Sequence, residues 1–192
     1  MKRLLFSIIF VTMAALAAYP QYTFTINDLI NVKRVADPQL SPDGRTVAFT
    51  IGTVSKDANK TVNQIYTVSI DGTNQRQLTN GSSSSSGPRW SPDGKRIAFM
   101  TGGQIWTMKP DGSDKDQVTK ISTGAGGPVW SPDGKFIAFG SDVYPACKTD
   151  ECNKAEDERL EKSKMQAHVT ERLLFKHWVE WRDRKRSHVF VV

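Results

Sequence analysis

Internal repetition constrains the fold of this 192-residue chain more than any other feature of its sequence. One unit carries Ser-Pro-Asp-Gly followed by an apolar run, and it occurs at residues 39–49, 89–99 and 129–139. A second unit begins with Gln-Ile and contains Asp-Gly at its end, and it occurs at residues 64–72 and 104–112. Both units recur every 40 residues, except for ten extra residues between Thr50 and Gln64 that we expect to form a loop. A fixed period of this length is typical of repeat architectures.

Each repeat reads as a set of short strands joined by turns. In Ser-Pro-Asp-Gly, the proline presets φ at the first corner, the aspartate accepts local backbone hydrogen bonds, and the glycine adopts the left-handed conformation. The apolar run at 47–49 predicts a buried strand, and the alternation at 65–70 predicts a half-buried one that ends at the hairpin signal 71–72. The polar segments that end at 78–79 and 118–119 would be outer strands at an exposed edge.

Four strands in 40 residues are typical of a β-propeller blade, so the sequence predicts an all-β fold, an incomplete β-propeller. We expect two full four-stranded blades, at residues 38–79 and 87–119, with the serine-rich loop 82–86 between them. A third blade starts within the predicted blade region 38–140, and residues 188–192 resume its strand pattern as the start of the next propeller strand.

A propeller protects its strand edges by closing a ring of about four to eight blades. Two blades and part of a third leave an open edge at each end. We therefore expect this chain to be the N-terminal portion of a longer protein. The alternative is a small open-sheet protein that packs its blades alone or oligomerises to close the ring.

Residues 1–18 resemble a secretory signal peptide. Lys2 and Arg3 precede an apolar stretch at 4–16, and Ala15-Leu16-Ala17 forms a cleavage site of the A-x-A type. The alternative is an uncleaved anchor, but this stretch is shorter than the roughly 20 residues that span a bilayer. We expect a periplasmic or secreted protein, with cleavage after residue 17 or 18 and no membrane span afterwards. Residues 19–37 would be an N-terminal segment with a short helix.

Composition excludes several classes of protein. With 38% hydrophobic and 24% charged residues, the chain suits an ordinary globular fold rather than a disordered one. The net charge is +6, and removal of Lys2 and Arg3 leaves +4, which is too weak a bias to imply a nucleic-acid partner. The charge run at 182–186 is interpreted as a solvated turn.

The predicted insertion, residues 141–187, changes the composition from Gly, Pro and Ser to Glu, Lys and Arg. It predicts a helix from Asn153 onward, with Asn153 as the N-cap, acidic residues at 156–158 in the first turn, and an i,i+4 pair of Glu158 with Lys162. An apolar stripe that would pack on the blade or on a neighbouring domain is formed by Leu174, Trp178 and Trp181.

Cys147 and Cys152 are the only cysteines. In an exported chain, we expect them to form a disulfide, because an oxidising compartment permits it. The alternative is a zinc site with His168 and His177 as further ligands. The eight residues between these histidines exceed the usual spacing of about three to five in a structural zinc finger.

No catalytic constellation is found in the sequence. A Gly-x-Ser-x-Gly nucleophile elbow is absent, and the serine run 82–86 lacks the necessary glycine spacing. His168, His177 and His188 lie in or just after the insertion, where solvated or packed histidines are the ordinary expectation. Phosphate-binding and metal motifs are also absent, so we expect no cofactor.

The repeated Trp-Ser-Pro-Asp-Gly-Lys-x-Ile-Ala-Phe units resemble WD40-like propeller repeats of the PD40 or TolB-like type. Such repeats are shared by periplasmic TolB and by the N-terminal domains of prolyl oligopeptidase-family (S9) serine peptidases. Residues 24–44 look like the opening of acylaminoacyl-peptidase or dipeptidyl-peptidase-like members. The insertion of the dipeptidyl-peptidase 5-like subgroup is similar to residues 144–153, 172–178 and 187–192.

This resemblance implies a propeller of seven or eight blades that caps a C-terminal α/β-hydrolase domain and filters substrates by size. The catalytic triad of the family belongs to the hydrolase domain, and no position here matches it. The resemblance thus implies a parent that cleaves short peptides and a chain that is inactive alone, with peptide substrates reached through the hydrolase domain. The alternatives are a TolB-like propeller that binds protein partners without catalysis, and a remnant without function.

Overall fold

The computed structural model describes residues 23–164, 167, 176–177, 180–181 and 184–192. The chain forms two units, Met1–Val32 and Lys33–Val192, and the predicted signal peptide lies outside the described residues. Within the first unit, helix α2 (Ile26–Asn31) is held by a capping box, in which Thr25 Oγ1 accepts from the backbone of Asp28 and the Asp28 carboxylate accepts from the backbone of Thr25.

The second unit begins with a four-stranded antiparallel sheet. Its strands are β1 (Arg34–Leu40), β2 (Thr46–Ser55), β3 (Lys60–Ser69) and β4 (Arg76–Gln77), in that order. Strand β1 starts before the predicted blade boundary at 38, because Arg34 already pairs with Gly52. The predicted loop between Thr50 and Gln64 is wrong. The ladder between β2 and β3 continues to the pair Ser55 and Lys60, so the extra residues lengthen a hairpin.

The second sheet repeats this arrangement. Its strands are β5 (Ser85–Trp90), β6 (Ile97–Thr101), β7 (Gln104–Met108) and β8 (Asp116–Gln117). Strand β5 includes Ser85 and Ser86, which the sequence assigns to a loop. The outer strands β4 and β8 end before residues 78–79 and 118–119, and Leu78, Thr79 and Thr119 are buried instead of lying at an edge. The Thr79 and Thr119 hydroxyls accept hydrogen bonds from the amides of Ile65 and Ile105, and these bonds hold the chain that follows each outer strand against its sheet.

The third sheet has the order β13-β10-β9 in the described part of the chain. Its strands are β9 (Gly126–Trp130), β10 (Ile137–Val143) and β13 (Arg186–Val191). Between β10 and β13 lie helix α3 (Asp150–Glu161) and the small pair of β11 (Lys176–His177) with β12 (Glu180–Trp181). Phe139 pairs with Phe190 as Phe99 pairs with Trp106, so β13 has the register of the third strand of a blade.

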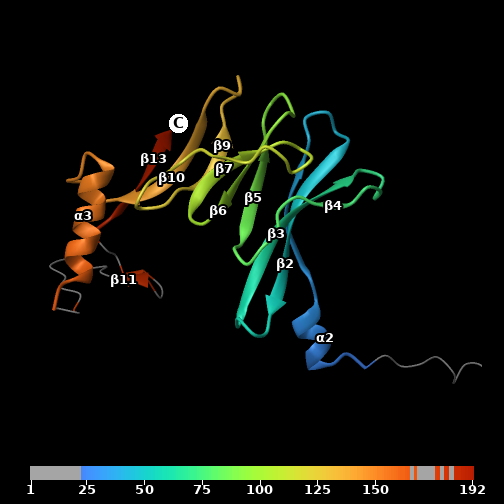
Figure 1. Ribbon diagram of the computed structural model, residues 1–192, viewed down its shortest axis with the longest axis horizontal. Coiled ribbons are helices and arrows are strands. Elements are labelled where there is room, and N and C mark those ends of the chain that lie inside the picture. Colours follow the sequence, from blue (N-terminus) through green and yellow to red (C-terminus); the bar gives the residue numbers. More distant parts are fainter. Residues whose placement is uncertain (1–22, 165–166, 168–175, 178–179, 182–183) are drawn as a thin grey trace, which may run out of the picture. The chain divides into compact units, whose positions relative to one another are not determined.

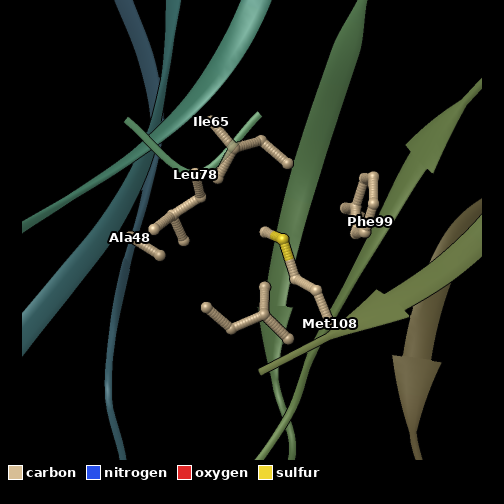
Figure 2. Packing of buried hydrophobic residues seen from close by; sticks show 6 residues of the cluster. Ala48, Ile65, Leu78, Phe99 and Met108 are labelled. Carbon is tan, nitrogen blue, oxygen red and sulfur yellow. The ribbon is translucent and has the colours of Figure 1, made fainter. Parts of the chain in front are cut away.

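The three sheets pack side by side in chain order (Figure 1). Two apolar clusters lie between them. One contains Ala48, Ile65 and Leu78 of the first sheet together with residues of the second (Figure 2). The other lies between the second and third sheets. The predicted fold class is confirmed, because the structure is mainly β and its open sheets agree with an incomplete propeller.

The Ser-Pro-Asp-Gly turns form as predicted. In the first, the Ser41 hydroxyl donates to Asp43 Oδ1 over 2.6 Å, the Arg45 amide donates to the same oxygen, and Gly44 has a φ of 72°. The same bonds recur in the second and third turns. In each turn the serine hydroxyl, and then the backbone amide, lower the pKa of the aspartate.

Candidate functional site

A pocket of about 360 Å³ opens between the second and third sheets, beside the strands from which the insertion leaves. Its lining comes from four segments of chain: Gly103 in the β6–β7 turn, residues 123–126 before and within β9, residues 140–142 in β10, and Ser187 in β13. Most of these residues are small, so much of the lining is backbone.

Glycines shape the side of the pocket that belongs to the second sheet. Gly103 has a φ of 70°, which the tight turn between β6 and β7 requires. The Ala125 amide donates to Gly103 O over 2.8 Å and holds the segment before β9 against this turn. A Cβ at Gly124 would lie 3.3 Å from Gly103 O, and Gly124 also has a positive φ. The close approach of the two segments therefore depends on glycine.

Hydroxyl groups and one carboxylate supply the polar side chains. The buried Ser141 hydroxyl donates to Gly124 O over 2.6 Å. Because its single proton is used there, the Thr123 hydroxyl, 2.8 Å away, donates to Ser141. On the other side of β10, the Ser187 hydroxyl donates to the Asp142 carboxylate. Asp142 is the only ionisable residue in the lining.

This arrangement suits recognition rather than nucleophilic catalysis. A serine nucleophile needs a base that accepts its proton, but the proton of Ser141 goes to a backbone carbonyl. His188 pairs with Ser141 across the β10–β13 ladder and is exposed. The pocket instead offers backbone carbonyl oxygens and a carboxylate, which accept hydrogen bonds from amide or ammonium groups.

Helix α3 is fixed beside the pocket by its first turn. Thr149 is the N-cap, and Asp150 accepts from the Ser122 amide at 2.9 Å and from the Ser122 hydroxyl at 2.7 Å. The prediction that Asn153 caps the helix is wrong. Thr149 has the extended backbone that an N-cap needs, whereas Asn153 is buried inside the helix and its Oδ1 accepts from the Tyr144 amide over 2.8 Å.

Both ends of the insertion meet on the same helix. The Tyr144 hydroxyl donates to Asp157 over 2.8 Å, and Lys185 Nζ lies 2.8 Å from the same carboxylate. Lys185 Nζ also lies 5.2 Å from the centre of the Tyr144 ring. Burial raises the pKa of Asp157, but the hydrogen bonds from Lys185 and Tyr144 outweigh it, so the pKa is lowered. The predicted pair of Glu158 with Lys162 is present at 3.3 Å.

The two cysteines form a disulfide in the structure, with Cα atoms 5.4 Å apart, at the start of α3. His168 lies outside the described residues, as does the side chain of His177. The predicted apolar stripe of Leu174, Trp178 and the Trp181 side chain lies there too. Among the residues that the structure describes, no group of three His, Cys, Asp or Glu side chains is placed to hold a metal ion.

The pocket residues were not predicted as a site from the sequence. Two signals point to them in retrospect: the Gly102-Gly103 pair between two strand patterns, and the glycine-rich run at 124–127. Glycine inside strand patterns marks a close approach of backbone. The sequence does not show that Asp142 and Ser187, 45 residues apart, are cross-strand partners.

Comparison with known proteins supports this architecture. The PD40 family model, described as "TolB beta propeller domain", matches residues 25–165. Dipeptidyl-peptidase 5 of Porphyromonas endodontalis is 32% identical over 163 residues, which cover 85% of this chain and 23% of that protein. Dipeptidyl-peptidase 5 of Porphyromonas gingivalis is 38% identical over 72 residues, which cover 38% of this chain and 10% of that protein. The chain thus spans less than a quarter of either relative.

Among solved structures, an acylaminoacyl peptidase in complex with Z-Gly-Gly-Phe-chloromethyl ketone has a TM-score of 0.61 and 17% sequence identity. The similarity covers 85% of this chain and 24% of that one, and it shows the fold alone. No helix in the described part of the chain has both the length and the apolar character that crossing a membrane requires.

Proposed function

The chain belongs to the PD40 family of TolB β-propeller domains, and from this premise we propose that it is the propeller portion of an exported S9-type serine peptidase. In this role it admits short peptides toward a catalytic domain and carries no triad of its own. The observation that carries the proposal is the 32% identity with dipeptidyl-peptidase 5 over 85% of this chain. The similarity extends beyond the repeats, because the matched 163 residues are more than the blades contain.

The pocket supports a role in handling peptides. Its lining includes the backbone of Gly103 and of residues 124–126. Gly103 O and Gly124 O each accept one internal hydrogen bond, and the second lone pair of a carbonyl oxygen can accept another from the main chain of a peptide. Asp142 adds a negative charge to the lining. A carboxylate stabilises the free amino terminus of a peptide by a charge-assisted hydrogen bond, which is stronger than a neutral one. The pocket therefore favours peptides with an unblocked amino terminus.

A binding experiment tests this role. The purified chain is titrated with trialanine and with N-acetyl-trialanine, and amide chemical shifts are followed by NMR. We expect trialanine to shift the resonances of Gly103, Gly124 and Gly126, and Asp142→Asn to weaken binding about tenfold, since a hydrogen bond to a charged group contributes about 1.5–3 kcal/mol. Asp57→Asn, in the exposed β2–β3 turn, is the matched control.

Two results would contradict the proposal: equal binding of the acetylated peptide, and shifts that map away from the pocket. Hydrolysis of a chromogenic dipeptidyl substrate, retained through repurification, would show a catalytic site in the chain itself. We expect no turnover.

A second candidate function is a TolB-like propeller that binds protein partners without catalysis, and the family model favours it by its own description. The genomic sequence downstream of Val192 separates the two. Further blades followed by a Gly-x-Ser-x-Gly elbow support the peptidase. A stop codon directly after further blades supports the binding protein.

A further inference from the structure

Asn80 and Gly81 lie in the segment that leaves the first sheet and enters the second. Asn80 is the only asparagine in the chain that is followed by glycine. Both residues are exposed, although Leu78 and Thr79 just before them are buried. The segment is exposed with both of the sheets that it joins in place.

The two groups that can react with each other in this pair are not held by the rest of the fold. In the described structure, the Asn80 side chain and the Gly81 amide form no hydrogen bond with another residue. A Cβ at Gly81 would meet nothing within 4 Å, and the φ of Gly81 is 110°, a region that glycine enters more readily than other residues. No side chain therefore hinders the approach of the Gly81 nitrogen to the side-chain carbonyl carbon of Asn80.

We propose that Asn80 is a site of spontaneous deamidation, at which the chain converts its own asparagine to aspartate and isoaspartate. Hydroxide removes the proton of the Gly81 amide, and the nitrogen then attacks Cγ of Asn80. A C–N bond forms, ammonia leaves with a proton from water, and a cyclic succinimide results. Water then opens this ring. The sum of the steps is the uptake of a water molecule and the release of ammonia, so neither an oxidant nor a reductant is needed.

The two products differ in the length of the main chain. Opening the succinimide at its side-chain carbon gives aspartate and restores the original main chain. Opening it at the main-chain carbonyl carbon gives isoaspartate, whose main chain passes through Cβ and Cγ and is longer by a methylene group. Both products add a negative charge at residue 80.

Gln64 of β3 holds the main chain on both sides of Asn80. Its Oε1 accepts from the Thr79 hydroxyl over 2.7 Å, and its Nε2 donates to Gly81 O over 3.1 Å. The Thr79 hydroxyl oxygen also accepts from the Ile65 amide over 2.8 Å. Because residues 79 and 81 are both fixed to the same side chain, we expect an additional methylene group between them to break one of these bonds.

The second sheet has the same arrangement around a different residue. Gln104 Oε1 accepts from the Thr119 hydroxyl, and its Nε2 donates to Ile121 O. Lys120 therefore has the position that Asn80 has in the first sheet, and it is exposed as well. Lysine has no side-chain carbonyl that an amide could attack. Asn80→Lys is thus a matched control, because it removes the reactive group and places a residue that the repeat already accepts.

Peptide mapping by mass spectrometry tests the proposal on the full chain. The purified protein is incubated at neutral and at mildly alkaline pH in oxygen-labelled water, and the modified fraction of Asn80 is followed over time. An enzyme that methylates isoaspartate distinguishes the two products. Asn74 is the internal control, because it is exposed but precedes glutamine, and its side-chain amide donates to the Ser69 and Thr73 hydroxyls.

We expect Asn80 to react at least about tenfold faster than Asn74. The rate should rise with pH, because hydroxide removes the amide proton, and the product should contain labelled oxygen. The Asn80→Lys variant should form no product at this position.

Urea unfolding separates the effect of the added charge from that of the longer main chain. The isoaspartate form, enriched by chromatography, should have a folding equilibrium constant about tenfold smaller than that of the parent chain, which corresponds to the loss of one hydrogen bond. Asn80→Asp adds the charge without the methylene group and should change this constant less.

Three results would overturn the proposal. If Asn80 stays intact while a synthetic peptide of residues 76–86 reacts, the fold keeps the two groups apart. A rate that is independent of pH, or a product without labelled oxygen, excludes the succinimide route. An isoaspartate form as stable as the Asn80→Asp variant shows that Gln64 does not fix the length of this segment.

Discussion

Replacing Ile105 by alanine tests whether packing between sheets holds the second and third blades together. Ile105 is fully buried in a cluster with Ala98, Ala125, Ile137 and Phe139. Three of these residues belong to the third sheet or to the chain that enters it. The loss of the side chain therefore weakens the contact between the two sheets as well as the second sheet itself.

The size of the effect follows from what is removed. Isoleucine exceeds alanine by three carbon groups, and at about 0.8 kcal/mol for each buried group the transfer contribution is about 2.4 kcal/mol. The surrounding residues close the resulting cavity only in part, which adds to the loss. We expect Ile105→Ala to lower the free energy of unfolding by about 3–4 kcal/mol. Ile65→Ala should cost about the same, because Ile65 has the equivalent buried position between the first and second sheets.

Val189→Ala is the matched control within the same repeat. Val189 has the position of Ile105 in the third sheet but is largely exposed. Its truncation should change the free energy of unfolding by less than about 0.5 kcal/mol when the chain is monomeric. Urea unfolding, followed by tryptophan fluorescence and by far-UV circular dichroism at low protein concentration, measures the three variants on one scale.

Equal costs for Ile105→Ala and Val189→Ala would refute this reasoning, because the two positions would then not differ in burial. So would a loss below about 1 kcal/mol for Ile105→Ala with an unchanged denaturant slope. If the two optical signals changed at different urea concentrations, the blades would unfold separately, and the cost would be assigned to the contact between them.

Other predictions concern single groups. Trp130→Phe removes an inter-sheet hydrogen bond of 3.0 Å and should cost about 1 kcal/mol in urea unfolding. The serine hydroxyl bound to Asp93, and then a backbone amide, lower its pKa below 3.8. The ionised Asp93 carboxylate therefore stabilises the fold above pH 3.8, and this contribution is lost as the pH falls through the lowered pKa. Asp93→Asn should make the free energy of unfolding depend less on pH in this range. Mass spectrometry before and after reduction should show one disulfide between Cys147 and Cys152; two free thiols in periplasmic protein would contradict it. N-terminal sequencing of exported protein should start after Ala17 or the following residue.

The repeat architecture was predictable because its signals are local. The serine, proline, aspartate and glycine of each turn act on backbone within a few residues, and the turns form with the expected bonds. The apolar runs after the turns become the buried strands β2, β6 and β10. Four strands in 40 residues then leave few architectures other than a blade.

The predictions of the β2–β3 loop and of the α3 N-cap were wrong for two reasons. Some structural features depend on residues distant in sequence, and some positions carry two residues that are equally suitable by type. The hairpin that extends to Ser55 and Lys60 has few apolar residues at its end, and its polar character resembles a loop. At the start of α3, both Thr149 and Asn153 are suitable N-caps by residue type. Asn153 is excluded by a contact with Tyr144, which no local rule indicates.

Part of the pocket lies where the insertion makes the third sheet depart from the repeat. In the second sheet, Gln104 begins β7, and its Oε1 accepts from the Thr119 hydroxyl while its Nε2 donates to Ile121 O. Gln64 accepts from Thr79 in the same way in the first sheet. His188 has this position in the third sheet, because it pairs with Ser141 as Gln104 pairs with Thr101.

The insertion therefore changes the chemistry of the third sheet without changing its register. Where the second sheet has the short turn at Gly103, the third sheet has a longer ladder that includes the pair of Asp142 with Ser187. These two residues form part of the pocket lining. The first two sheets have no such pair in the described structure, since their corresponding hairpins carry other residues. A property that is not common to all propeller repeats is therefore expected where the insertion leaves β10 and returns to β13.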